Sequence, residues 1–189
     1  MASELIVQTL KGPTSGANAN KIIVPTGQTL DASAGALIPD SGAVVQTTVW
    51  EIPATSVSTD GSWAVSTTPT IANTYNVGNY SFTKKFSGSK VVCVVAGHVD
   101  HANITGTPTI VALFESGSGT LIGSGYRHIR YNNDEPFPYS FSGTDTSTGT
   151  SKTYTLRCHC AGGPMYFSRM ASGDFGHSKF TVTLMEIAG

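Results

Sequence analysis

The feature that most constrains the fold is a series of short alternations of apolar and polar residues between residues 75 and 189. Thr153–Cys160 places an apolar or sulfur-bearing side chain at every second position, and Lys179–Ile187 does so at Phe180, Val182 and Leu184. A period of two is the pattern of a strand with one buried face. Val91–Val99 is apolar on both faces, which is typical of a central strand.

The segments between these runs carry turn residues. Ser116–Gly119 separates two apolar runs and predicts a hairpin loop. No segment has the 3.6-residue spacing of an amphipathic helix. Seven or eight short strands joined by Gly, Ser, Asn and Asp turns favour an all-β fold, and we predict an antiparallel jelly-roll β-sandwich over residues 75–189.

A different pattern occupies residues 21–46, which we call the collar segment. Its apolar residues form very short runs cut by proline and glycine, too short to build a core of their own. Such runs become stable when they pack against identical runs from other copies, so we predict an assembly collar, for which a family resemblance given below implies a trimer. The predicted collar residues are Ile22, Ile23, Val24, Leu30, Leu37, Ile38, Val44 and Val45.

This prediction divides the chain into three parts. Residues 1–20 are an N-terminal attachment segment with one possible strand followed by turn residues, for which a frayed terminus is the alternative. Residues 21–74 are the β-rich collar and a polar connector. Residues 75–189 are the sandwich that the collar carries.

Composition excludes several classes of function. Charged residues are 12% of the chain, against roughly 25% in an average globular protein, and the net charge is −1. A chain without a basic surface is not expected to bind nucleic acid or an anionic membrane. The N-terminal sequence has neither a signal-peptide pattern nor a membrane span. We therefore expect that the protein does not insert into a membrane and that it is assembled in the cytoplasm of a cell.

The cysteines support this compartment. The chain has three, Cys93, Cys158 and Cys160, and an odd number argues against a disulfide framework. Cys158 and Cys160 would share one face of a strand, at the far edge of disulfide geometry. We therefore expect three reduced and mostly buried thiols.

Candidate metal and catalytic residues are weak. His98, Asp100 and His101 lie close in sequence, and a zinc site with the Cys158–Cys160 region is conceivable, but the spacing fits no standard zinc pattern. No G-x-S-x-G motif marks a nucleophile, and Asp134 and Glu135 are adjacent rather than paired across a cleft. We therefore expect no metal, no cofactor and no enzymatic activity.

One loop is the best candidate for binding. Between residues 131 and 139 the chain combines amide and carboxylate side chains, which bond sugar hydroxyls, with tyrosines, which stack on sugar rings. The candidate ligand residues are Tyr131, Asn132, Asn133, Asp134, Glu135 and Tyr139. The same composition is normal for a jelly-roll crossover loop, and we favour that structural interpretation.

The segment KGPTSGANANKIIVPTGQTLDASAGALIPDSGAVVQ resembles the collar of tail-fibre and related virion proteins of tailed bacteriophages, especially those of marine and cyanobacterial hosts. The segments YSFTKKFSGSKVVCVVAGHV, TIVALFESGSGTLIGSG and FTVTLMEIAG resemble the C-terminal sandwich of the same family, whose topology is similar to complement-type and tumour-necrosis-factor-like heads. The resemblance covers about two-thirds of the chain.

The resemblance implies a structural protein of a phage virion, such as a short tail fibre, adaptor or appendage. Such a protein docks by its N-terminus on other tail, neck or head proteins, forms a homotrimer and presents its C-terminal head. The alternative function is a receptor-binding module that recognises a host surface glycan or protein through the loop at residues 131–139.

Overall fold

A computed structural model describes residues 15–16, 41–59, 68–101, 107–129, 137–160, 163–168 and 179–189. Contacts divide the chain into two units, residues 1–38 and residues 39–189. Nearly all described residues belong to the second unit, which is the subject of the following description. The predicted attachment segment and the collar residues from Ile22 to Ile38 therefore lie outside the described residues, apart from Ser15 and Gly16.

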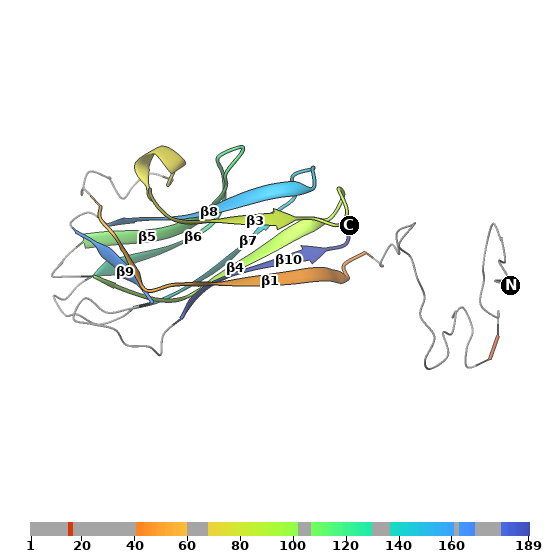
Figure 1. The fold of residues 1–189 in the computed structure, drawn as a ribbon, viewed down its shortest axis with the longest axis horizontal. Helices are drawn as coiled ribbons and strands as arrows, with labels where there is room; N and C mark the ends of the chain where they lie inside the picture. Colours follow the sequence, from red (N-terminus) through yellow and green to blue (C-terminus); the bar gives the residue numbers. More distant parts are fainter. Residues whose placement is uncertain are drawn as a thin grey trace, which may run out of the picture. The chain divides into compact units, whose positions relative to one another are not determined.

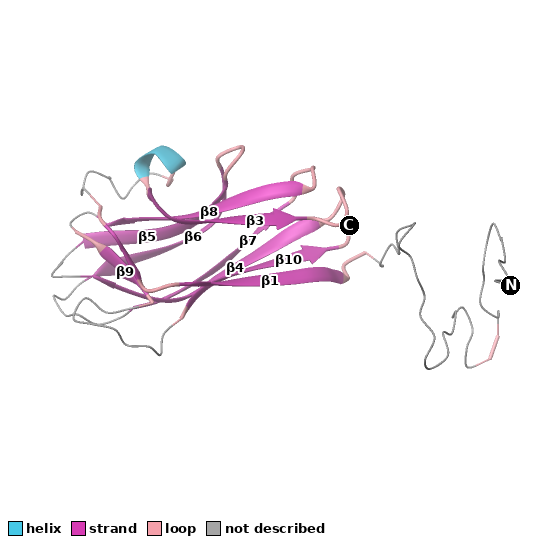
Figure 2. Cartoon of the chain, in the orientation of Figure 1, coloured by secondary structure: helices cyan, strands magenta, loops and turns pink. Residues whose placement is uncertain are grey.

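The second unit is a sandwich of two antiparallel sheets (Figures 1 and 2). Sheet A has the order β1-β10-β4-β9-β2, with β7 also paired to β4, and sheet B has the order β3-β8-β5-β6. The elements are β1 (Val44–Ile52), β2 (Thr55–Val57), the 3-10 helix η1 (Ile71–Asn73), β3 (Tyr75–Thr83), β4 (Lys90–His101), β5 (Thr107–Glu115), β6 (Thr120–Ile129), β7 (Phe137–Asp145), β8 (Ser151–Cys160), β9 (Met165–Phe167) and β10 (Phe180–Ile187). The predicted all-β, jelly-roll-like fold is confirmed. No helix among the described residues is long and apolar enough to cross a membrane.

The predicted start of the sandwich at Tyr75 is wrong. β1 pairs with β10 along its whole length, with Trp50 opposite Val182 and Ile52 opposite Phe180. Ile52 is buried in the core and Trp50 packs against it. The strand that begins at Val44 is thus part of the sandwich, and Val44 and Val45 are strand residues of the head.

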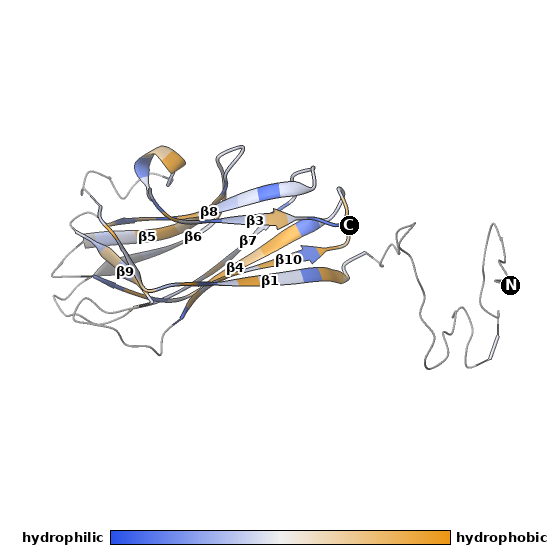
Figure 3. Cartoon of the chain, in the orientation of Figure 1, coloured by the Kyte–Doolittle hydropathy of each residue, from blue (hydrophilic) through white to orange (hydrophobic). Residues whose placement is uncertain are grey.

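The core lies between the sheets and is built from the alternations seen in the sequence. β10 contributes Phe180, Val182 and Leu184, and β4 contributes apolar residues from its inward face; all are at most 1% exposed. β4 lies between β10 and β7 at the centre of sheet A, as its apolar pattern predicts (Figure 3). Each fully buried side chain of this size contributes roughly 1.5–3 kcal/mol.

The three cysteines are free and buried in this core, as predicted. Cys93 points inward from β4, and Cys158 and Cys160 point inward from β8. Burial, followed by the charge of Asp145, raises the pKa of Cys93 to about 12. Burial also raises the pKa of Cys158. These thiols therefore act as small apolar side chains.

Glycines close one side of the sandwich, where β6 of sheet B meets β7 of sheet A. A Cβ atom at Gly143 of β7 would lie 1.9 Å from the carbonyl oxygen of Ile122 on β6. A Cβ atom at Gly123 of β6 would lie 2.9 Å from the carbonyl oxygen of Ser142. Only glycine permits this approach of the two backbones.

The two ends of the sandwich differ. At one end, which we call the base, the chain leads into β1, and Gly42 donates a hydrogen bond to the carbonyl of Ala188 beside the C-terminus. Figure 1 shows the start of β1 and the C-terminus at this same end. At the other end, which we call the tip, β4 ends at His101 and β7 begins at Phe137. β6 ends at Ile129, and residues 130–136, which lie outside the described residues, separate it from β7 in the sequence.

Candidate functional site

The predicted ligand loop is divided by the structure. Residues 131–135 lie outside the described residues. Tyr139 lies within β7, is 3% exposed, and shares a hydrogen bond with the Thr109 hydroxyl of β5. The prediction of Tyr139 as a ligand residue is wrong because β7 begins at Phe137, so the alternation points Tyr139 into the core. Its hydroxyl ties sheet A to sheet B.

The histidine and cysteine candidates do not converge. His98 is exposed on the outer face of β4, whereas His101 is 3% exposed and lies 6.2 Å from Phe137, measured between ring centroids. Cys158 and Cys160 belong to the core. Within the described ranges, no group of three or more His, Cys, Asp or Glu side chains is arranged to hold a metal ion.

Because His101 is buried, we expect it to make the stability of the fold depend on pH. Desolvation lowers its pKa to about 4. In the unfolded chain a histidine binds a proton near pH 6.5, so between pH 6.5 and 4 the unfolded state holds more protons and stability falls as the pH falls. We expect the free energy of unfolding to drop by about 2 kcal/mol between pH 7 and pH 5 because of this residue alone.

The His101→Phe variant tests this expectation. Urea titrations at pH 7 and pH 5 should show a smaller loss of stability in His101→Phe than in the wild type. His98→Gln, which changes an exposed histidine of the same strand, should keep the wild-type loss. Equal losses in wild type and His101→Phe would contradict the assignment.

The base is held by buried charged groups. Glu186 is fully buried on the inward face of β10 and accepts hydrogen bonds from the backbone nitrogens of Lys85 (2.8 Å) and Phe86 (2.9 Å). It also accepts from the Ser89 hydroxyl (2.5 Å) and from Nε2 of Gln46 (2.7 Å). Burial alone would raise the pKa of Glu186, but these hydrogen bonds outweigh it and the pKa is lowered. We call these residues the Glu186 cluster.

Gln46 connects this cluster to the other sheet. Its Nε2 also donates to the carbonyl of Thr83 on β3, 2.7 Å away. Lys84, 3% exposed, donates from Nζ to the carbonyls of Ser87, Ser89 and Ser147. The first residues of β1 are thereby fixed to both sheets at the end where the preceding chain arrives.

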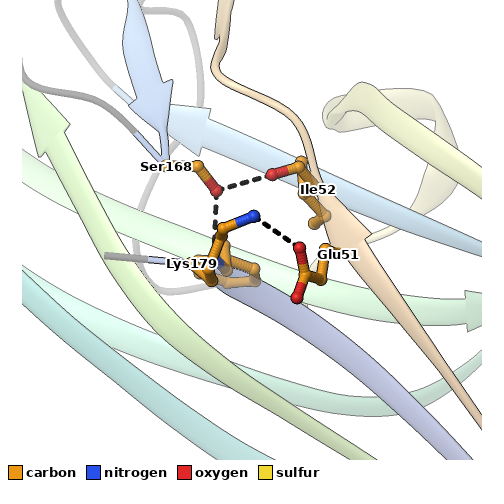
Figure 4. Close-up of polar contacts among 5 residues, drawn as sticks. Glu51, Ile52, Ser168 and Lys179 are labelled. Atoms are coloured by element: carbon orange, nitrogen blue, oxygen red, sulfur yellow. Dashed lines mark hydrogen bonds and ion pairs between the residues drawn. The ribbon is translucent and has the colours of Figure 1, made fainter. Parts of the chain in front are cut away.

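The far end of β1 is also fixed. The Ser168 hydroxyl donates to the carbonyl of Ile52 (2.6 Å) and accepts from the backbone nitrogen of Phe180 (3.0 Å) (Figure 4). Ser168 has a φ of 54°, a left-handed conformation that is uncommon outside glycine. Beside it, Lys179 and Glu51 form an ion pair of 2.5 Å, but both side chains are about 60% exposed, so the pair contributes little stability.

The outer faces of the two sheets are unlike. On sheet B the outward residues Ile110, Ala112 and Phe114 of β5 are at most 3% exposed. The segment around η1 lies outside this sheet, and Arg157 of β8 donates from Nε to the Thr74 hydroxyl at 2.9 Å (Figure 2). The chain thus covers part of the outer face of sheet B itself.

The outer face of sheet A remains accessible. Val49 is 55% and Val44 is 60% exposed. The apolar residues of this face, all at least partly exposed, are Val44, Val49, Val92, Val94, Ala96, Met185 and Ile187. A solvated face of an antiparallel sheet normally carries polar side chains. We call this surface the sheet A face, and it is the candidate functional site. The sequence carried its signal in the apolar residues on both faces of Val91–Val99.

Comparison with known proteins assigns no family: no family model matches the sequence, and no curated protein matches it. Among solved structures, the chain is similar to the C-terminal domain of EclA, a sugar-binding protein (14% identity, 87% of this chain, 95% of that chain, TM-score 0.35). It is also similar to VP2 of infectious bursal disease virus, with 12% identity over 93% of this chain and 46% of that chain and a TM-score of 0.38. A third similar structure is that of Bacillus endospore appendages that form disulfide-linked pili, with 13% identity over 78% of this chain and 95% of that chain and a TM-score of 0.26. The chain spans less than half of the VP2 chain.

Proposed function

We propose that this chain is a structural component of a phage virion, a short tail fibre, adaptor or appendage. It docks by residues 1–20 on other tail, neck or head proteins, trimerises, and presents the sandwich as its head. The observation that carries the assembly is the contrast between the two sheets: the sheet A face exposes valine and methionine, whereas much of the outer face of sheet B is buried.

The physical argument is the cost of leaving the sheet A face in water. Completing the burial of a half-exposed valine or methionine contributes about 1 kcal/mol. Several such side chains in adjacent strands therefore supply several kcal/mol to each contact between copies. At the centre of the face, Val94 lies between Thr183 of β10 and Ser142 of β7. These neighbours are uncharged, so contact between copies at this point desolvates no charged side chain.

The position of the chain at the base supports the same function. The preceding residues enter at Val44, and the Glu186 cluster fixes the start of β1 to both sheets. Because β1 is fixed to both sheets, a force applied through the collar segment reaches the whole sandwich and does not separate β1 from it. The strand ends at the tip lie at the opposite end, where a projecting head would meet the host.

A receptor-binding function is the second candidate. Residues 131–135 come between β6 and β7 in the sequence, and three copies on one trimer would multiply weak contacts with a host glycan or protein. A glycan array probed with the full-length protein tests this function. We propose no enzymatic activity, so incubation with polysaccharide or peptidoglycan should release no products.

The proposed place in the virion is tested on purified particles. We expect the protein to copurify with particles in multiples of three copies per attachment point, with three-fold density at that point in a particle reconstruction. A protein that is made during infection but is missing from purified particles would contradict the proposal.

A further inference from the structure

A pocket of about 180 Å³ lies at the base, on the side of the sandwich where β6 meets β7. It is lined by Ser118, by residues 120–122 at the start of β6 and by residues 144–147 at the end of β7. The register between β5 and β6 shifts here and leaves Ile122 as the extra residue of a β-bulge. A bulge bends its strand, and this one lies beside the pocket.

Short hydroxyl-bearing side chains make up most of the wall. They are Ser118, Thr120, Thr144, Thr146 and Ser147. A hydroxyl group can both donate and accept a hydrogen bond, so this wall suits a ligand that also carries hydroxyls. Leu121 and Ile122 add apolar surface. A largely apolar surface with a few convergent polar groups is the usual make-up of a small-molecule site.

A buried carboxylate completes the pocket. Asp145 is 5% exposed and accepts hydrogen bonds from the backbone nitrogen of Ser147 and from the Tyr154 hydroxyl, both at 2.8 Å. A carboxylate offers about four acceptor sites, so about two remain for ligand hydroxyls.

The charges at the pocket favour a neutral ligand. Burial would raise the pKa of Asp145, but hydrogen bonds and the charge of Lys152 lower it, so the group is ionised at neutral pH. Lys152 itself donates from Nζ to the Ser147 hydroxyl at 2.6 Å. An anionic ligand would be repelled by Asp145, and a cationic ligand would be repelled by Lys152.

We propose that this pocket binds one neutral sugar unit. The ring hydroxyls bond to Asp145 and to the hydroxyls of the wall, and the C–H face of the ring packs on Leu121 and Ile122. Pockets for drug-sized ligands have roughly 300–1,000 Å³, so this smaller one takes a single unit. The unit is either a free monosaccharide or the end of a glycan. The inference does not rest on the assembly proposed above, and it places a sugar site apart from residues 131–135.

The test is a titration of the full-length protein with glucose, galactose, mannose and N-acetylglucosamine, followed by saturation-transfer NMR. Each sugar is also tested as its methyl glycoside, which represents the end unit of a glycan. The wall variant Thr144→Ala/Thr146→Ala removes two hydroxyls from exposed residues, so the fold should be kept. The matched control, Thr47→Ala/Thr83→Ala, makes the same change at two exposed strand residues outside the pocket.

We expect at least one sugar to bind the wild type and the control with a Kd of about 1–10 mM, as for a ligand of this size. Binding to the wall variant should be at least about fivefold weaker, because two hydrogen bonds are lost. Equal binding of the methyl glycoside identifies a glycan end as the ligand, and binding of the free sugar alone identifies a monosaccharide; both support the pocket.

Two results would overturn the inference. One is the absence of saturable binding by any of these sugars up to about 50 mM. The other is equal affinity in the wall variant and the control, which would place the sugar elsewhere on the protein. Light scattering on the same samples reports the oligomer, so a failure of the pocket and a failure of the assembly are seen separately.

Discussion

Replacing Glu186 with alanine should destabilise the sandwich by about 3–5 kcal/mol, because the buried Ser89 hydroxyl and the partly buried groups that bond to its carboxylate lose their acceptor. The backbone nitrogens of Lys85 and Phe86 and the amide of Gln46 all donate to it. Each buried donor left without a partner costs about 1–3 kcal/mol. The loss should appear as a lower urea midpoint with an unchanged slope, measured at one fixed protein concentration.

Two further variants identify the cause. Glu51→Ala removes an exposed carboxylate from the same sheet and should change stability by less than about 1 kcal/mol. Glu186→Gln keeps one acceptor oxygen but brings an amide donor toward other donors, so it should recover less than half of the loss. A Glu186→Ala protein within about 1 kcal/mol of the wild type would contradict the role of the cluster.

The cluster also predicts an acid response. The pKa of Glu186 is below its usual value in the folded state, so its contribution is complete above the unfolded pKa and is lost as the pH falls through the folded one. Asp145 behaves in the same way: burial would raise its pKa, but hydrogen bonds from Ser147 and Tyr154 and the charge of Lys152 leave it lowered. Both carboxylates therefore make the free energy of unfolding fall as the pH falls, as His101 does, but at a lower pH than His101.

Placing a lysine at the centre of the sheet A face should abolish association of the heads. Val94 points outward from β4 between two polar neighbours and is partly exposed in a single copy. In Val94→Lys the ammonium group extends into water while the copy is single, so folding is little affected. In a trimer the same group would be buried without a partner, at a cost of several kcal/mol per copy.

The control adds the same charge elsewhere. Ser81→Lys changes an exposed residue of β3 in sheet B and should leave the oligomer unchanged. Circular dichroism of both variants should match the wild type. A Val94→Lys protein that remains fully trimeric would show that the heads do not meet through this face, and would leave assembly to the collar segment alone.

The strands of the head were predictable because alternation is a local property. Val91–Val99, apolar on both faces, is the central strand β4, and Ser116–Gly119 is the β5–β6 hairpin. The position of β1 was not predictable in this way. An edge strand has the same local pattern whether it pairs with its own head or with another copy, and the polar connector from Thr67 to Thr74 suggested a boundary between β1 and the sandwich that does not exist.

Two buried charged residues of the base have a signal in the sequence. Glu186 follows Phe180, Val182 and Leu184 at the next inward position of the same alternation, and Lys84 follows Tyr80 and Phe82 in the same way. An acid and a lysine at inward positions indicate buried charges that need partners. Their partners come from distant loops and from Gln46, and such contacts depend on the three-dimensional fold.

The central claim is that copies of this chain assemble, and the mass of the full-length protein in solution tests it most directly. Light scattering at micromolar concentration should give three times the 19.7 kDa of one chain. The same measurement on Val94→Lys separates the contribution of the head from that of the collar segment. A wild-type protein with the mass of one chain, folded and stable at that concentration, would contradict the account.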